Sequence, residues 1–170
     1  MQMFGSGLSK AIVVTVASLS WGCLYGFQGG GLPGHIRTVA IIPFDNQTPE
    51  PSLTIEVNDA IREAVESRLG LRASSEETAD AIVRGAILNY AADIPLQFRG
   101  DEQGNVSVTR RRVQLSIRVE IFDQRENRML WERPNLRVDG EYDPPEEQEG
   151  RRLALDKLVS DIVDGAQSQW

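Results

Sequence analysis

The chain has 170 residues, a formal net charge of −7 and a single cysteine. A chain this acidic is unsuited to binding nucleic acid through general electrostatics, and its aromatic content of 6% offers no stacking platform for single strands. One cysteine also excludes an internal disulfide, so a hydrophobic core must hold the fold.

The N-terminus has the pattern of a secretory signal. Lys10 precedes the apolar run Ala11–Leu19, and the small residue Gly22 directly precedes Cys23. A cysteine in this position indicates a bacterial lipoprotein, in which the thiol takes up a diacylglyceryl group, the peptide is cut before it, and the new amine is acylated by a fatty acid such as palmitate. We therefore predict a lipoprotein signal peptide over residues 1–22 and lipidation of Cys23.

Two alternatives to lipidation remain at this stage. A typical lipobox has leucine three residues before the cysteine, where this chain has Ser20. The segment would otherwise be a cleaved soluble signal or a retained anchor. The apolar run is shorter than the ~20 residues that a spanning helix needs, which ranks the anchor last.

Residues 23–35 are rich in glycine and predict a flexible tether, and residues 36–170 predict a single domain. Along that domain we expect a strand over 36–44, a helix that starts at Ser52 or Thr54 and stops at Gly70, a strand over 80–94, a strand over 106–123, a turn over 124–127, a strand over 128–138, an acidic connection over 139–150, and a closing helix. Helices and strands that each bury one face predict an α+β fold. We expect a two-layer sandwich, with a four-stranded mixed sheet, two helices on one face and the order β-α-β-β-β-α.

The segment 106–123 has the clearest alternation in the chain. One face is apolar: Val113, Leu115, Ile117, Val119 and Ile121. The other face is polar and carries Arg110, Arg112 and Arg118. Because guanidinium groups bind phosphate in a bidentate fashion, these three arginines are candidate anion contacts. The alternative is that they keep the strand soluble or pair with the acidic connection.

No catalytic constellation emerges from the sequence. The one histidine, His35, stands at the end of the tether, and the one cysteine is predicted to be acylated, so neither a Cys-His nor a Ser-His pair is expected. Zinc coordination by cysteine and histidine is excluded for the same reason. We predict no enzymatic activity, no metal and no cofactor, and assign no role to His35.

Several short motifs together resemble one family. They are the start at Cys23, the segment GGGLPGHIRTVAIIPFDNQTPEP, the segment ADAIVRGAI before a long alternating strand, the strand end Leu130-Trp131-Glu132, and a closing helix before Trp170. This set resembles the lipopolysaccharide-assembly lipoproteins of the LptE family. The resemblance implies a non-enzymatic outer-membrane lipoprotein, lipid-anchored and facing the periplasm or lying inside a barrel lumen. Its implied partners are the β-barrel LptD, which it plugs and helps to assemble, and lipopolysaccharide, whose lipid A phosphates would suit Arg110, Arg112 and Arg118.

A second class stays open. The strand end IIPFDNQT followed by a helix is also similar to the periplasmic domains of CsgG-type secretion-channel lipoproteins and to TolB N-terminal domains, which act as envelope adaptors or pore components. Pore formers need added amphipathic hairpins with ~9–11 residues in each membrane strand. Only residues 106–138 could supply such a hairpin in this chain, and we expect them to form part of the sheet instead.

Overall fold

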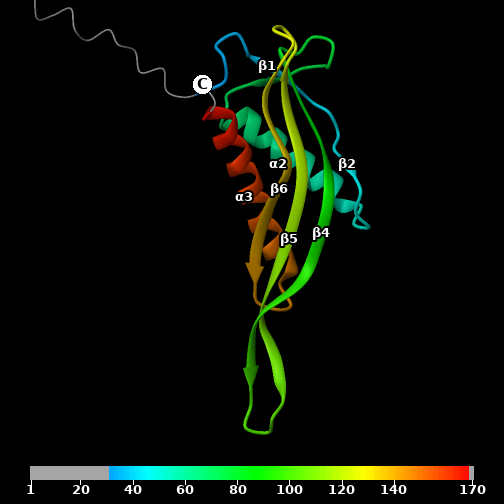
Figure 1. Ribbon diagram of the computed structural model, residues 1–170, viewed down its shortest axis with the longest axis vertical. Helices are drawn as coiled ribbons and strands as arrows, with labels where there is room; N and C mark the ends of the chain where they lie inside the picture. The colour runs from blue at the N-terminus through cyan, green and yellow to red at the C-terminus, as the bar shows by residue number, and fades with distance from the viewer. Residues whose placement is uncertain (1–30, 169–170) are drawn as a thin grey trace, which may run out of the picture.

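The computed structural model describes residues 31–168, which form one mixed sheet with both helices packed on one of its faces (Figure 1). The strands are β1 (Thr38–Ile41), β2 (Asp45–Asn46), β3 (Arg72–Ala73), β4 (Ala81–Gly100), β5 (Val106–Asp123) and β6 (Arg128–Tyr142), and the helices are α2 (Ser52–Ser67) and α3 (Glu147–Gln167). The predicted signal peptide, Cys23 and the tether up to residue 30 lie outside the described residues.

The strand order in the sheet is β3-β1-β4-β5-β6, and β2 pairs with β4 beside this path. Strand β1 runs parallel to β3 and β4, whereas β4, β5 and β6 are antiparallel neighbours. The predicted α+β sandwich with a mixed sheet is confirmed. The predicted number of four strands is wrong, because β2 and β3 have two residues each and are too short to produce a periodic pattern.

The hairpin of β4 and β5 runs past the ends of both helices (Figure 1). We expected the second long strand to end before Pro95, but β4 continues to Gly100. Shifts of register between Ala91 and Ile94 and around Pro95 accommodate the proline, as β-bulges do. The projecting part carries Phe98 and Val106 as exposed apolar side chains.

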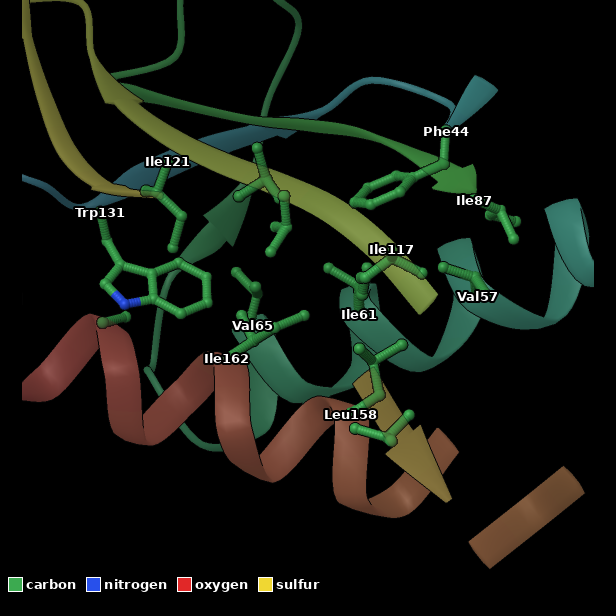
Figure 2. Close-up of a cluster of buried hydrophobic side chains, with 14 of the residues drawn as sticks. Phe44, Val57, Ile61, Val65, Ile87, Ile117, Ile121, Trp131, Leu158 and Ile162 are labelled. Carbon is green, nitrogen blue, oxygen red and sulfur yellow. The ribbon is translucent and has the colours of Figure 1, made fainter. Parts of the chain in front are cut away.

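The core lies between the sheet and the two helices. The five alternate apolar residues of β5 are all buried, as predicted. Figure 2 shows Ile117 and Ile121 of this strand facing Ile61 of α2 and Ile162 of α3. Both helices are therefore amphipathic covers of one sheet face, and the opposite face of the sheet is free of helices.

The ends of α2 agree only in part with expectation. The helix begins at Ser52, one of the two predicted starts, but its N-cap residue is Pro51 and no side chain caps it. The hydroxyl of Ser52 instead donates to Glu50 at 2.8 Å. Gly70 ends the helical segment with φ of 65°, a conformation that favours glycine.

A buried carboxylate, Asp80, joins the start of β4 to β1. It accepts hydrogen bonds from the amides of Arg37 at 2.9 Å and Thr38 at 3.0 Å, and it pairs with Arg125 at 2.6 Å. The hydrogen bond from the Arg37 amide, helped by Thr38 and the charge of Arg125, lowers the pKa of Asp80 to about 2 although burial opposes this.

Because the pKa of Asp80 is lowered, we expect the protein to lose stability in acid. A depressed pKa contributes stability that is complete above the unfolded value of 3.8 and is lost as the pH falls towards about 2. We expect the free energy of unfolding of Asp80→Asn to be lower by about 1–3 kcal/mol at pH 7 and to fall less than that of the unmodified protein between pH 4 and pH 2. Urea titrations at each pH would measure it. Asp156→Asn, at an exposed position on α3, is the control, and equal slopes for all three proteins would contradict the expectation.

Candidate functional site on the open face of the sheet

The face of the sheet that carries no helix is charged along β5 and β6. The register pairs Arg112 with Glu141, Gln114 with Asp139, and Ser116 with Arg137. Along β5 these positions alternate with the core residues Val113, Leu115 and Ile117, so their side chains lie on the helix-free face. We call this surface the open face.

Two of the three predicted arginines are paired with carboxylates. Arg112 lies 3.3 Å from Asp139, and Arg110 lies 3.3 Å from Asp143 and 3.7 Å from Glu141. Arg110 also borders a shallow cleft whose other charged residues are acidic. Their positive charge is therefore largely neutralised by residues of the segment 139–150, and an incoming anion would compete with acidic groups there.

The third predicted arginine, Arg118, has a different setting. It is exposed, and no acidic partner is found for it among residues 31–168. The nearby pair of Arg84 and Glu120, 2.9 Å apart, is complete in itself. Arg118 is therefore the predicted residue most available to an anionic ligand.

The sequence prediction missed a second such arginine, Arg137 of β6. It lies opposite Ser116, two residues from Arg118 along β5, so the two arginines are diagonal neighbours on the open face. Within the described chain Arg137 also lacks an acidic partner. Two exposed guanidinium groups at this spacing present up to ten N–H donors to an anion such as a phosphate.

His35, to which the sequence assigned no role, lies at the end of the sheet where β5 turns into β6. His35 lies 2.7 Å from Asp123 at the end of β5 and 3.8 Å from Glu126 in the turn between β5 and β6. The side chain of Asp123 is fully buried. This contact therefore attaches His35, the last residue of the tether, to the folded domain.

The fold and this surface define a class of protein. It is an α+β sandwich in which helices cover one face of the sheet and the other face, within residues 31–168, is a broad charged surface. Neither helix within residues 31–168 is long and apolar enough to cross a membrane.

Comparison with known families identifies the chain further. The model of the LptE family, described as lipopolysaccharide-assembly, matches residues 36–168. The chain belongs to this family, and the resemblance noted from its motifs is confirmed.

Solved structures share the fold at low sequence identity. Hypothetical protein CT253 from Chlamydia trachomatis has 15% identity and a TM-score of 0.50, covering 77% of this chain and 98% of that chain. The PelC dodecamer from Paraburkholderia phytofirmans has 12% identity and a TM-score of 0.51, covering 82% and 95%. A structure from Caulobacter crescentus CB15, named a putative lipoprotein, has 15% identity and a TM-score of 0.50, covering 75% of this chain and 87% of that chain. No curated protein sequence matches the chain significantly.

Proposed function

We propose that this protein is an outer-membrane lipoprotein, anchored through Cys23, that partners an LptD-type β-barrel and assists lipopolysaccharide assembly at the outer leaflet. The observation that carries the proposal is the match of the LptE family model to nearly the whole described domain. The protein acts by binding, without an enzymatic step, and lies in the periplasm or within the barrel lumen.

The N-terminal sequence supports the anchor. An apolar run, a small residue and then Cys23 match the order of a lipoprotein signal. The acylated cysteine would hold the domain at a membrane through the glycine-rich tether. Stable anchoring requires at least two lipid attachments, and the diacylglyceryl group and the amide-linked acyl chain would provide them.

Arg118 and Arg137 are the residues of the open face best suited to the phosphates of lipopolysaccharide. Arg110 and Arg112, proposed with Arg118 from the sequence, are secondary contacts in this arrangement because each already pairs with a carboxylate. A charge-assisted contact to phosphate contributes about 1.5–3 kcal/mol.

A native detergent extraction tests this function. We expect the protein to co-purify with a large outer-membrane β-barrel, and its intact mass to correspond to a chain that starts at Cys23 and carries a diacylglyceryl group and one further acyl chain. Cys23→Ala is the matched control and should leave the membrane fraction. A stable monomer without a barrel, or an unmodified N-terminus, would contradict the proposal.

A further inference from the structure

His35 is the only histidine of the chain, and both of its ring nitrogens face carboxylates. Nε2 lies 2.7 Å from Oδ2 of Asp123, and Nδ1 lies 3.8 Å from Oε1 of Glu126. The residue joins the tether to β1, and Asp123 is 88 positions away in the sequence. The contact therefore connects the last residue of the tether to the end of β5, far along the domain sequence.

Each carboxylate is held in place by its other oxygen. Oδ1 of Asp123 accepts hydrogen bonds from the amides of Arg125 at 2.8 Å and Glu126 at 3.0 Å. The second oxygen of Glu126 lies 2.7 Å from Arg128. Both carboxylates thus direct one oxygen towards the imidazole of His35.

The carboxylate of Asp123 keeps its charge in this position. Burial opposes ionisation, but the hydrogen bonds from the Glu126 amide, His35 and the Arg125 amide outweigh it and lower the pKa of Asp123. The nearby guanidinium of Arg125 is engaged by Asp80 at 2.6 Å. The charged groups near the imidazole are therefore the carboxylates of Asp123 and Glu126. Arg128 pairs with Glu126, and Arg125 pairs with Asp80.

This arrangement matches a doubly protonated ring. A neutral imidazole has a single N–H, so one nitrogen would direct a lone pair at a carboxylate. A protonated ring donates a hydrogen bond from Nε2 to Asp123 and places its second N–H at ion-pair distance from Glu126. A bound zinc ion fits less well, because ligands at 2.0–2.1 Å in a tetrahedron are separated by about 3.3 Å, and Nε2 and Oδ2 are closer than that.

We propose that His35 is a pH-sensitive latch, which holds the tether junction, residues 31–36, on the turn between β5 and β6 when its imidazole is protonated. Two apolar contacts hold the junction as well, since Ile36 is buried and Leu32 packs against the core. The latch therefore controls the short part of the junction between Leu32 and Ile36 and leaves the domain folded when it opens.

A closed latch would orient the domain. The junction and the turn between β5 and β6 lie at one end of the sheet, and the tip of the hairpin between Gly100 and Val106 lies at the other (Figure 1). Twenty residues of β4 separate these ends, a distance of about 60 Å at ~3.3 Å per residue with some loss at the bulges. A junction fixed at the turn lies at the end of the sheet opposite the hairpin tip, and an open junction gives the domain more freedom.

The sign of the pH effect follows from the proton. The two facing carboxylates attract an imidazolium more strongly than a neutral imidazole, so we expect the latch to hold in acid and to open as the pH rises. Hydrogen exchange of the purified full chain, corrected for intrinsic rates, would measure protection of residues 31–37 from pH 5 to pH 9. We expect about fivefold less protection at the high end, because the ion-pair attraction of His35 is lost while a neutral ring can still donate one hydrogen bond to Asp123. Residues 113–121 are the internal reference.

Two variants complete the test. His35→Gln keeps a hydrogen-bond donor but carries no charge, and it should show the low protection at every pH. Glu126→Gln should retain part of the pH dependence through Asp123. A pH profile of His35→Gln equal to that of the unmodified protein would overturn the proposal. Release of the junction by EDTA at constant pH would also overturn it, because a metal rather than a proton would then close the junction.

Discussion

Replacing Gly140 with alanine is expected to destabilise the protein by more than about 3 kcal/mol. Gly140 lies on β6 where α3 crosses, and a Cβ atom there would overlap the carbonyl oxygen of Gly150 and lie 2.7 Å from the amide nitrogen of Ala154. Both neighbours are backbone atoms of the helix, which cannot rotate away as a side chain would. Overpacking typically lowers the free energy of unfolding by about 1–3 kcal/mol and occasionally by more. We expect the larger effect here because α3 as a whole must move away from β6.

Chemical denaturation of the purified protein measures this effect, and Gly100→Ala is the matched control. Gly100 is also a strand glycine without positive φ, and the nearest atom to its added Cβ is 4.0 Å away. We expect the control to change the free energy of unfolding by less than about 0.5 kcal/mol. Equal stability of the two variants would show that β6 and α3 separate without cost at this contact.

The faces of the sheet could be predicted from the sequence because β5 is long. Eighteen residues with a period of two leave no doubt about which side chains are buried, and the open-face position of Arg118 follows from that alternation alone. The two-layer arrangement follows in turn, since two amphipathic helices need one common apolar surface. The close approach at Gly140 was not predicted, because residues 139–150 were expected to form an acidic connection, whereas β6 extends to Tyr142.

The pairing of β6 with β5 could not be predicted in the same way. Counting from the paired ends of the turn, Asp123 and Arg128, a regular hairpin would place Arg137 opposite Gln114. The structure has two register shifts, one near Leu130 and one at Pro134, and these move Arg137 opposite Ser116. Each shift moves side chains to the other face and the second restores them, so only the pair of shifts places Arg137 beside Arg118 on the open face.

The contacts of His35 with Asp123 and Glu126 could not be predicted from the sequence for a different reason. Its partners lie in a turn 88 and more residues further along the chain, and a lone histidine in a glycine-rich segment has no local pattern that indicates a contact. Long-range pairs of this kind depend on the order of the strands in the sheet, in which β4 pairs with both β1 and β5 and brings the start of β1 near the end of β5.

Simultaneous replacement of Arg118 and Arg137 by alanine is expected to weaken lipopolysaccharide binding by about 10-fold to 100-fold. The pair carries the open-face charges that no described carboxylate neutralises, and charge-assisted hydrogen bonds to phosphate contribute about 1.5–3 kcal/mol each, with partial compensation from neighbouring groups. Binding of the purified protein to lipopolysaccharide micelles, measured at two salt concentrations, would show both the loss of affinity and a weaker salt dependence.

Two further variants separate this site from general surface charge. Arg112→Ala should have a smaller effect than the double variant, because Asp139 already neutralises Arg112 at 3.3 Å. Arg152→Ala removes an equal charge from α3, where Glu149 and Asp156 pair with it, and should leave binding unchanged. If the double variant binds like the unmodified protein while Arg110→Ala and Arg112→Ala weaken binding, the contact lies at the paired end of the strand. In that case lipopolysaccharide must displace the acidic segment 139–150 in order to bind.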